Sequence, residues 1–173
     1  MYSTTVTRYW NPDKVKVYSS QITSYTCYSS WHSRSDIANI ANITGTVELR
    51  APYKLEHIND GFFCIKEDYL SYINKNGEEG WIQADLIKHY KLKCVRFAFF
   101  RHFGEIEIRF GNFSRDQGLN LNGVIAYQKD FLERSTAEYC VDRPIVGQYV
   151  IVESYKYIGY DFLNIGSMQI IVE

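Results

Sequence analysis

The sequence lacks the features that define several large classes of protein. It contains only 3 Pro and 11 Gly in 173 residues, and no window approaches the roughly 18 consecutive apolar residues of a membrane-spanning helix. The formal net charge of −1 and the absence of a basic run provide no long-range field that would attract phosphate backbones. These absences argue against a collagen-like, a membrane-spanning or a nucleic-acid-binding protein.

Metal and catalytic motifs are missing as well. The 4 Cys include no Cys-x-x-Cys pair, which argues against a zinc or redox centre. The 4 His belong to no nucleophile elbow, zincin helix or Cys–His signature. Glu105 and Glu107 are expected to form a solvated face of a strand rather than an acid–base pair. We therefore predict that the protein is not an enzyme.

What the sequence does contain is a large number of aromatic residues within short alternating segments. Hydrophobic residues make up 46% of the chain, with 15 Tyr and 10 Phe, and aromatic side chains favour half-buried sheet surfaces. The expected strands are residues 45–49, 81–86, 91–100, 105–110, 123–127, 147–152 and 168–172. Turn signals occur at residues 59–61, 74–77, 103–104, 122–123 and 143–144. This pattern predicts an all-β, antiparallel jelly-roll β-sandwich of about eight strands.

The first 37 residues differ from the rest of the chain. Residues 1–37 are rich in Ser, Thr and Tyr, and residues 14–18 alternate like a short strand. We interpret this segment as an N-terminal extension, either the remnant of a preceding module or an extra strand added to the main body. Residues 38–173 are predicted to form the β-sandwich domain.

Cysteines and glycosylation motifs bear on the compartment. The even number of Cys permits one or two disulfides in an oxidising compartment, although Cys94 is expected to be a buried core thiol because it lies within an apolar alternation. Two sequons, at Asn42 and Asn112, would accept N-glycans in a secretory pathway if both are exposed. The N-terminal residues lack the charged-then-apolar layout of a signal peptide. A secreted chain would therefore carry a signal that has been removed or replaced.

A family resemblance is visible in the second half of the chain. Residues 81–86 (WIQADL) resemble the W-(W/I)-Q-V-D-L strand of discoidin-like domains, the coagulation-factor type C superfamily. Residues 55–61 (LEHINDG) resemble the turn that precedes this strand, and residues 90–97 (YKLKCVRF) and 106–111 (IEIRFG) resemble two strands that follow it. The resemblance covers about residues 45–173 and implies the jelly-roll fold of galactose-binding domains.

Within this superfamily the sequence is most similar to F-type lectins, or fucolectins. Residues 140–150 (CVDRPIVGQYV) resemble their C-x-x-P-x-x-G-R-Y-V segment, and residues 163–172 fall where the family closes its sheet. The resemblance implies a ligand site in loops at one end of the sandwich. Arg101 matches one of the family's two pocket arginines, and Tyr72, Asn74 and Asn76 occupy the region of its pocket histidine.

The predicted ligand-binding residues are Arg101, His102, Tyr72 and Asn74. Together they offer hydrogen-bonding groups and an aromatic face, which is what recognition of a sugar ring requires. The resemblance also implies a calcium-supported site, for which Asn59, Asp60 and Asp68, with Glu67 nearby, provide the hard oxygen ligands that calcium takes. Calcium is the one cofactor that the sequence suggests.

The sequence therefore predicts a non-enzymatic, secreted or cell-surface carbohydrate-recognition domain that binds a glycan or glycoprotein through its loops. The alternative is an adhesion or assembly module that binds a protein partner or membrane lipid through the same loops. This alternative is suggested by the adjacent phenylalanines at residues 62–63 and 99–100, of which at least half are expected to be core. Oligomer formation is left open.

Overall fold

The structure is a computed structural model. It describes residues 15–19, 25–27, 35–46, 55–60, 64–66, 71–72, 80–102, 105–128, 132–155 and 163–173. The elements are β1 (Val15–Ser19), β2 (Tyr25–Cys27), η3 (Ala38–Ile40), β3 (Asn42–Gly45), η4 (Leu55–Ile58), β4 (Cys64–Lys66), β5 (Ser71–Tyr72), β6 (Gly80–His102), β7 (Glu105–Gly111), α1 (Arg115–Gly118), η6 (Leu119–Leu121), β8 (Gly123–Gln128), β9 (Leu132–Tyr155) and β10 (Leu163–Val172). Apart from single turns of helix, the described elements are strands.

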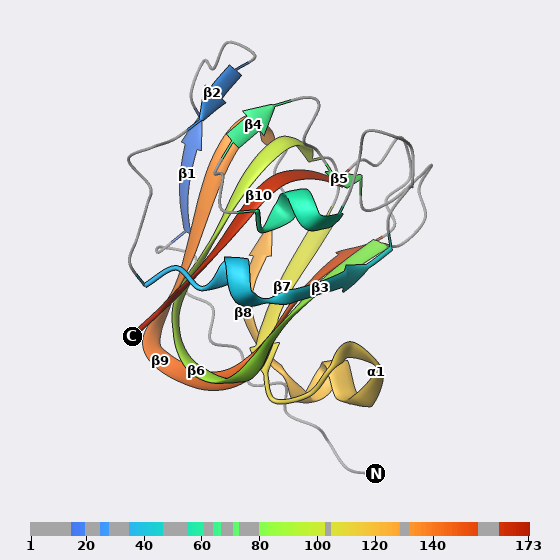
Figure 1. The fold of residues 1–173 in the computed structure, drawn as a ribbon, viewed down its shortest axis with the longest axis vertical. Coiled ribbons are helices and arrows are strands. Elements are labelled where there is room, and N and C mark those ends of the chain that lie inside the picture. The colour runs from blue at the N-terminus through green and yellow to red at the C-terminus, as the bar shows by residue number, and fades with distance from the viewer. Residues whose placement is uncertain are drawn as a thin grey trace.

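Two long antiparallel strands, β6 and β9, form a ribbon that bends and contributes to both layers of the sandwich (Figure 1). In the first layer the order is β3, the first part of β6, the last part of β9, β7 and β8. In the second layer the order is β5, β10, the last part of β6, the first part of β9 and β1. All of these pairings are antiparallel, so the predicted all-β antiparallel sandwich is confirmed.

The bend in the ribbon has a local cause. Asp85 faces Tyr149 and Tyr90 faces Gly147, so residues 86–89 of β6 stand opposite Gln148 alone. The Asp85 carboxylate accepts hydrogen bonds from the backbone N–H of Ile87 at 2.7 Å and from the Gln148 amide at 2.8 Å. These bonds hold Ile87 at a φ of 69°, a conformation that is uncommon for a branched residue. We call this bend, residues 86–91 and 145–148, the corner end.

The core lies between the two layers and follows the period-2 alternation of the strands. Side chains that alternate inward from β6 and β9 are almost fully buried. They are Ile82, Ala84, Leu86, Val95, Phe97 and Phe99 from β6 and Ala137, Tyr139, Val141, Val150 and Val152 from β9. Ile58 of η4 and Ala38 of η3 close the same core. The apolar residues of these alternating segments therefore face the core, as the alternation predicts.

Some predicted boundaries were wrong. The strands predicted at residues 81–86 and 91–100 are one continuous strand, β6. The turn predicted at residues 143–144 lies inside β9, where residues 141–144 bulge opposite Lys93 between two paired positions. The strand predicted at residues 45–49 begins earlier, as β3, and its last residues fall outside the described part of the chain. A long strand can continue through a local irregularity because the pairing on either side of a bulge is preserved.

Part of the predicted N-terminal extension joins the main sheet. Residues Val15–Ser19 form β1, which pairs with β9 from Tyr139 to Ser135. Further along, Asp36 forms a bridge with Ile171, and its carboxylate accepts a hydrogen bond from the N–H of Ile170. The boundary at residue 37 remains a prediction. Among the described helices, none has the length and apolar character needed to cross a bilayer.

Candidate functional site

The fold brings two of the predicted ligand positions close together at the backbone. In β10, Asn164 is paired with Tyr72 of β5 on one side and with Arg101 of β6 on the other. Arg101 is in turn paired with Glu133 of β9. Tyr72, Asn164, Arg101 and Glu133 thus form one row across four strands, at the end of the second layer remote from the corner end. We call these four positions the ligand row.

The other predicted ligand residues are placed differently. His102 lies in the adjacent row, paired with Leu163 and Leu132. Asn74 lies outside the described residues. Asn164 and Glu133 were not among the predicted site residues, since nothing in their sequence context singles them out and only the pairing of β5, β10, β6 and β9 places them beside Arg101.

The calcium positions are only partly described. Asn59 follows η4, and its amide nitrogen donates hydrogen bonds to the carbonyls of Ala38 at 3.0 Å and Ala41 at 2.9 Å. This side chain therefore ties η3 to η4, and its oxygen points away from the two carbonyls. Asp60 is exposed, and Asp68 lies outside the described residues. An oxygen from Asn59 and a carboxylate from Asp60 suit calcium in kind but make only part of the 6–8 ligands it takes, so the ion remains a prediction.

The outer face of the first layer carries a hydrogen-bonded cluster centred on Arg115 of α1. The Arg115 guanidinium donates to the Glu153 carboxylate at 2.6 Å and lies 4.9 Å from the centre of the Trp81 ring. Its backbone N–H donates to the Gln83 side chain at 2.7 Å. Burial raises the pKa of Glu153 above its ordinary value of 4.5, and the hydrogen bond and charge of Arg115 partly oppose that rise. Arg115 therefore fastens α1 to the sheet.

A second group on this face surrounds Arg109. Its guanidinium donates to Glu107 and to the carbonyl of Asn122 at 3.0 Å. The Tyr155 hydroxyl donates to the same Glu107 carboxylate at 3.0 Å, and burial followed by the Glu107 charge raises the pKa of Tyr155 to about 12. Glu105 accepts a hydrogen bond from the Tyr127 hydroxyl.

These contacts correct the expectation that Glu105 and Glu107 form a solvated face. Both are half-buried, because the Arg109 and tyrosine side chains lie against them. Each carboxylate accepts a hydrogen bond from a neighbouring side chain. These bonds hold the side chains of the outer face together. The cluster satisfies its own polar groups and so does not by itself indicate a ligand site.

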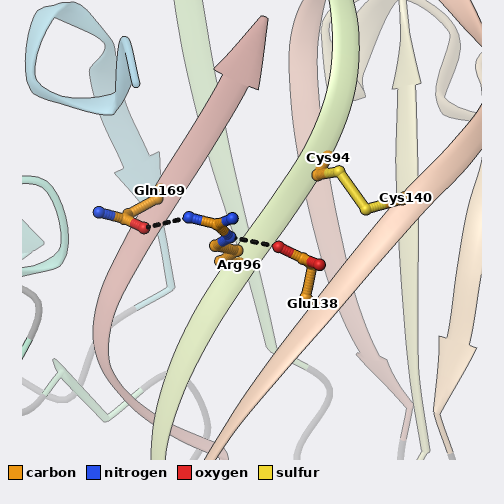
Figure 2. The surroundings of a disulfide bond; sticks show 5 residues. All are labelled: Cys94, Arg96, Glu138, Cys140 and Gln169. Atoms are coloured by element: carbon orange, nitrogen blue, oxygen red, sulfur yellow. Dashed lines mark hydrogen bonds and ion pairs between the residues drawn. A yellow bond between two sulfur atoms is a disulfide. The ribbon is translucent and has the colours of Figure 1, made fainter. Parts of the chain in front are cut away.

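The outer face of the second layer contains a disulfide. Cys94 of β6 is bonded to Cys140 of β9, directly opposite in register, with their Cα atoms 4.0 Å apart. The expectation that Cys94 is a core thiol was wrong, because alternation places it on the face opposite Phe97 and the other core residues of β6. Figure 2 shows Arg96 beside this bond, between Glu138 of β9 and Gln169 of β10.

This group does not form a metal site. The ligand atoms of Cys94, Glu138 and Cys140 lie within 4.8 Å of one another. However, both sulfur atoms are used in the disulfide, and the Glu138 carboxylate is ion-paired with Arg96 (Figure 2). A disulfide sulfur is not a thiolate and therefore is not a metal ligand of the usual kind. The disulfide and the ion pair therefore link β6 to β9.

The same fold is found in solved carbohydrate-binding modules. Over 79% of this chain and 97% of the other, it matches the family 32 carbohydrate-binding module of C. perfringens NanJ in complex with galactose, with a TM-score of 0.61 and 13% identity. It matches chitosan-binding module 1 of the Paenibacillus sp. IK-5 chitosanase/glucanase with a TM-score of 0.63 and 12% identity, over 78% and 97% of the two chains. The predicted discoidin-like architecture is thereby confirmed.

A lectin shares the fold too. The serum f-lectin (fucolectin) of Morone saxatilis, the striped bass, matches with a TM-score of 0.65 and 16% identity over 82% of this chain. This chain spans about half of that lectin, 48% of its length. No protein-family model matches the sequence, and no curated protein matches it. The likeness therefore lies in the three-dimensional fold.

Proposed function

We propose that the protein is a non-catalytic, extracellular carbohydrate-binding domain that recognises glycans at the ligand row. The observation that carries this proposal is the pairing of Tyr72 and Arg101 on either side of Asn164. Sugar sites combine amide, guanidinium and carboxylate groups with an aromatic ring, and the four residue types of the ligand row supply all of these. The sandwich that holds them is shared with a galactose-bound module and a fucolectin.

The extracellular setting has separate support. Disulfides persist mainly in oxidising compartments, and the Cys94–Cys140 bond is part of the described structure. The structural neighbours are binding modules and a lectin. Calcium held near Asn59 and Asp60 is a further part of this proposal, and the binding experiment below includes it.

The test is a glycan array with the purified protein, run in calcium and again in a chelator. The array should include galactose-terminated, fucose-terminated and chitosan-type glycans. We expect binding to one of these groups, and we expect Arg101→Ala and Asn164→Ala each to weaken it about tenfold, the equivalent of about 1.4 kcal/mol. Loss of binding in the chelator alone would identify the calcium contribution.

The matched control is Arg143→Ala. Arg143 is exposed and lies in the bulge of β9, so its removal takes away the same charge without touching the ligand row. Arrays that are blank with and without calcium would contradict a carbohydrate-binding function. They would direct attention to the alternative, a protein partner or a lipid bound by the same loops.

A further inference from the structure

Both sequon asparagines lie at one end of the sandwich. Asn42 of β3 is paired with Asp85, Asp85 with Tyr149, and Tyr149 with Gly111. Asn112 directly follows Gly111, so the two sequons stand at the two sides of one row that crosses the first layer next to the corner end. The length of β6 that belongs to the second layer separates this row from the ligand row.

Both asparagines are exposed, and among the described residues neither side-chain amide has a hydrogen bond of the kind that occupies other asparagines. Asn59 donates to two carbonyls, and Asn122 is buried, with its amide bonded to the backbone of Phe113 at 2.6 Å and 3.1 Å. Within the part of the chain that the structure describes, Asn42 and Asn112 have no comparable role in holding the fold. An N-glycan needs such an accessible amide nitrogen.

The same end carries most of the exposed apolar side chains. Of the five large exposed hydrophobic residues in the described part of the chain, four are here: Ile87 at 68% exposure, Leu121 at 60%, Val146 at 56% and Phe113 at 39%. Ile87 and Val146 belong to the bend itself. Phe113 and Leu121 lie in the loop between Gly111 and Asn122.

The loop begins and ends beside the bend. A Cβ atom on Gly147 would lie 2.8 Å from the carbonyl oxygen of Gly111, and one on Gly111 would lie 3.1 Å from the Cα atom of Asn122. The backbones therefore meet closely, which brings the two pairs of apolar side chains to the same end. Where exposed apolar side chains form a contiguous surface, that surface generally marks a place that another group contacts or covers.

We propose that Asn42 and Asn112 carry N-linked glycans, which cover the exposed apolar side chains at the corner end. In the reaction, Nδ2 of each asparagine forms a bond to the anomeric carbon of an oligosaccharide and gives up a proton. The bond from that carbon to a lipid diphosphate breaks, so no oxidant or reductant is needed. The Cys94–Cys140 bond points independently to the secretory pathway in which this donor is found.

This modification does not depend on the proposed sugar-binding function. Because both acceptors are remote from the ligand row, glycans attached to them leave that row open. Phe113 is the middle residue of its own sequon, so a glycan on Asn112 lies next to one of the apolar side chains that it is proposed to cover.

The experiment is secretion of the full chain from a eukaryotic host, followed by intact mass measurement before and after enzymatic removal of N-glycans. We expect two glycans, one lost in Asn42→Gln and the other in Asn112→Gln. Thr44→Ala and Ser114→Ala should give the same losses while keeping each asparagine, and Thr44→Ser should retain its glycan. Ser114 makes no side-chain capping bond to α1, so its replacement leaves the helix start intact.

The matched controls are Asn39→Gln and Asn120→Gln, which change exposed asparagines outside the sequons and should leave two glycans. A folded, disulfide-bonded secreted protein with the unmodified polypeptide mass would overturn the proposal, and an unmodified Asn42 or Asn112 would overturn it for that residue.

The covering role has its own readout, the fluorescence of a dye that binds exposed apolar surface. Enzymatic deglycosylation should raise dye binding at least about twofold, because the apolar side chains become accessible. The double variant Ile87→Ser/Leu121→Ser should cancel that rise without changing the number of glycans. Equal dye binding by the glycosylated and deglycosylated proteins would overturn the covering role.

Discussion

The outer faces of the two layers are held together by different side-chain links. Each has an arginine–glutamate pair, Arg96 with Glu138 in the second layer and Arg115 with Glu153 in the first. In the second layer the pair lies beside the Cys94–Cys140 bond, whereas the first-layer strands contain no cysteine. One face should therefore respond mainly to reduction and the other mainly to pH.

The largest expected effect is on the second layer. Replacing both Cys94 and Cys140 by Ala should lower the free energy of unfolding by about 3 to 4 kcal/mol, because the bond closes a loop of 46 residues in the unfolded chain. Urea unfolding of the variant and of the wild type, each with and without reductant, measures the effect. The variant should respond to reductant less than the wild type does, although it keeps Cys27 and Cys64, which are paired in register in β2 and β4. A wild type whose unfolding midpoint shifts no more with reductant than that of the variant would show that the Cys94–Cys140 bond contributes little.

The first layer should instead show a pH-dependent loss. Arg115→Gln should cost about 1 kcal/mol near neutral pH, since the pair is about one-third exposed on the arginine side and partly screened. Glu153 has a pKa raised by burial, and without Arg115 that pKa should rise further. A raised pKa in the folded state means that the ionised carboxylate costs stability above the folded pKa and costs nothing once it is protonated.

The loss caused by Arg115→Gln should accordingly shrink as the pH falls through the pKa of Glu153. Urea midpoints measured from neutral pH down to the ordinary carboxyl range give the profile, with Arg143→Gln as the control for simple loss of charge. In the double variant Arg115→Gln/Glu153→Gln the pH dependence of this stability loss should vanish. A deficit that stays constant across this range would mean that Arg115 acts only by packing on Trp81.

The smallest effect concerns Tyr155. Tyr155→Phe removes its hydrogen bond to Glu107 and should cost about 1 kcal/mol or less. Because its pKa is raised from 10.0 to about 12, the folded protein loses stability from this group as the pH rises above 10.0. Absorbance titration of the phenol groups should show one fewer late-titrating tyrosine in the variant. Loss of a tyrosine that titrates near 10.0 instead would place Tyr155 in an ordinary solvent environment.

Much of this architecture could be read from the sequence. Alternation in residues 81–86, 91–100 and 147–152 gives the correct inward faces because burial on one side of a sheet imposes a period of two. The resemblance of residues 81–86 and 140–150 to discoidin-like segments gave the fold. Positions within a strand are thus determined locally, by the order of polar and apolar residues.

Pairing between strands could not be read in this way. Cys94 looks like a core thiol until β9 places Cys140 opposite it, and Glu107 looks solvated until Arg109 and Tyr155 lie against it. The same holds for Asn164, which becomes a candidate ligand residue only because β10 inserts between β5 and β6. The sequence by itself determined the strands and their buried faces; the register between distant strands, which depends on contacts far apart in the chain, was decided only by the tertiary structure.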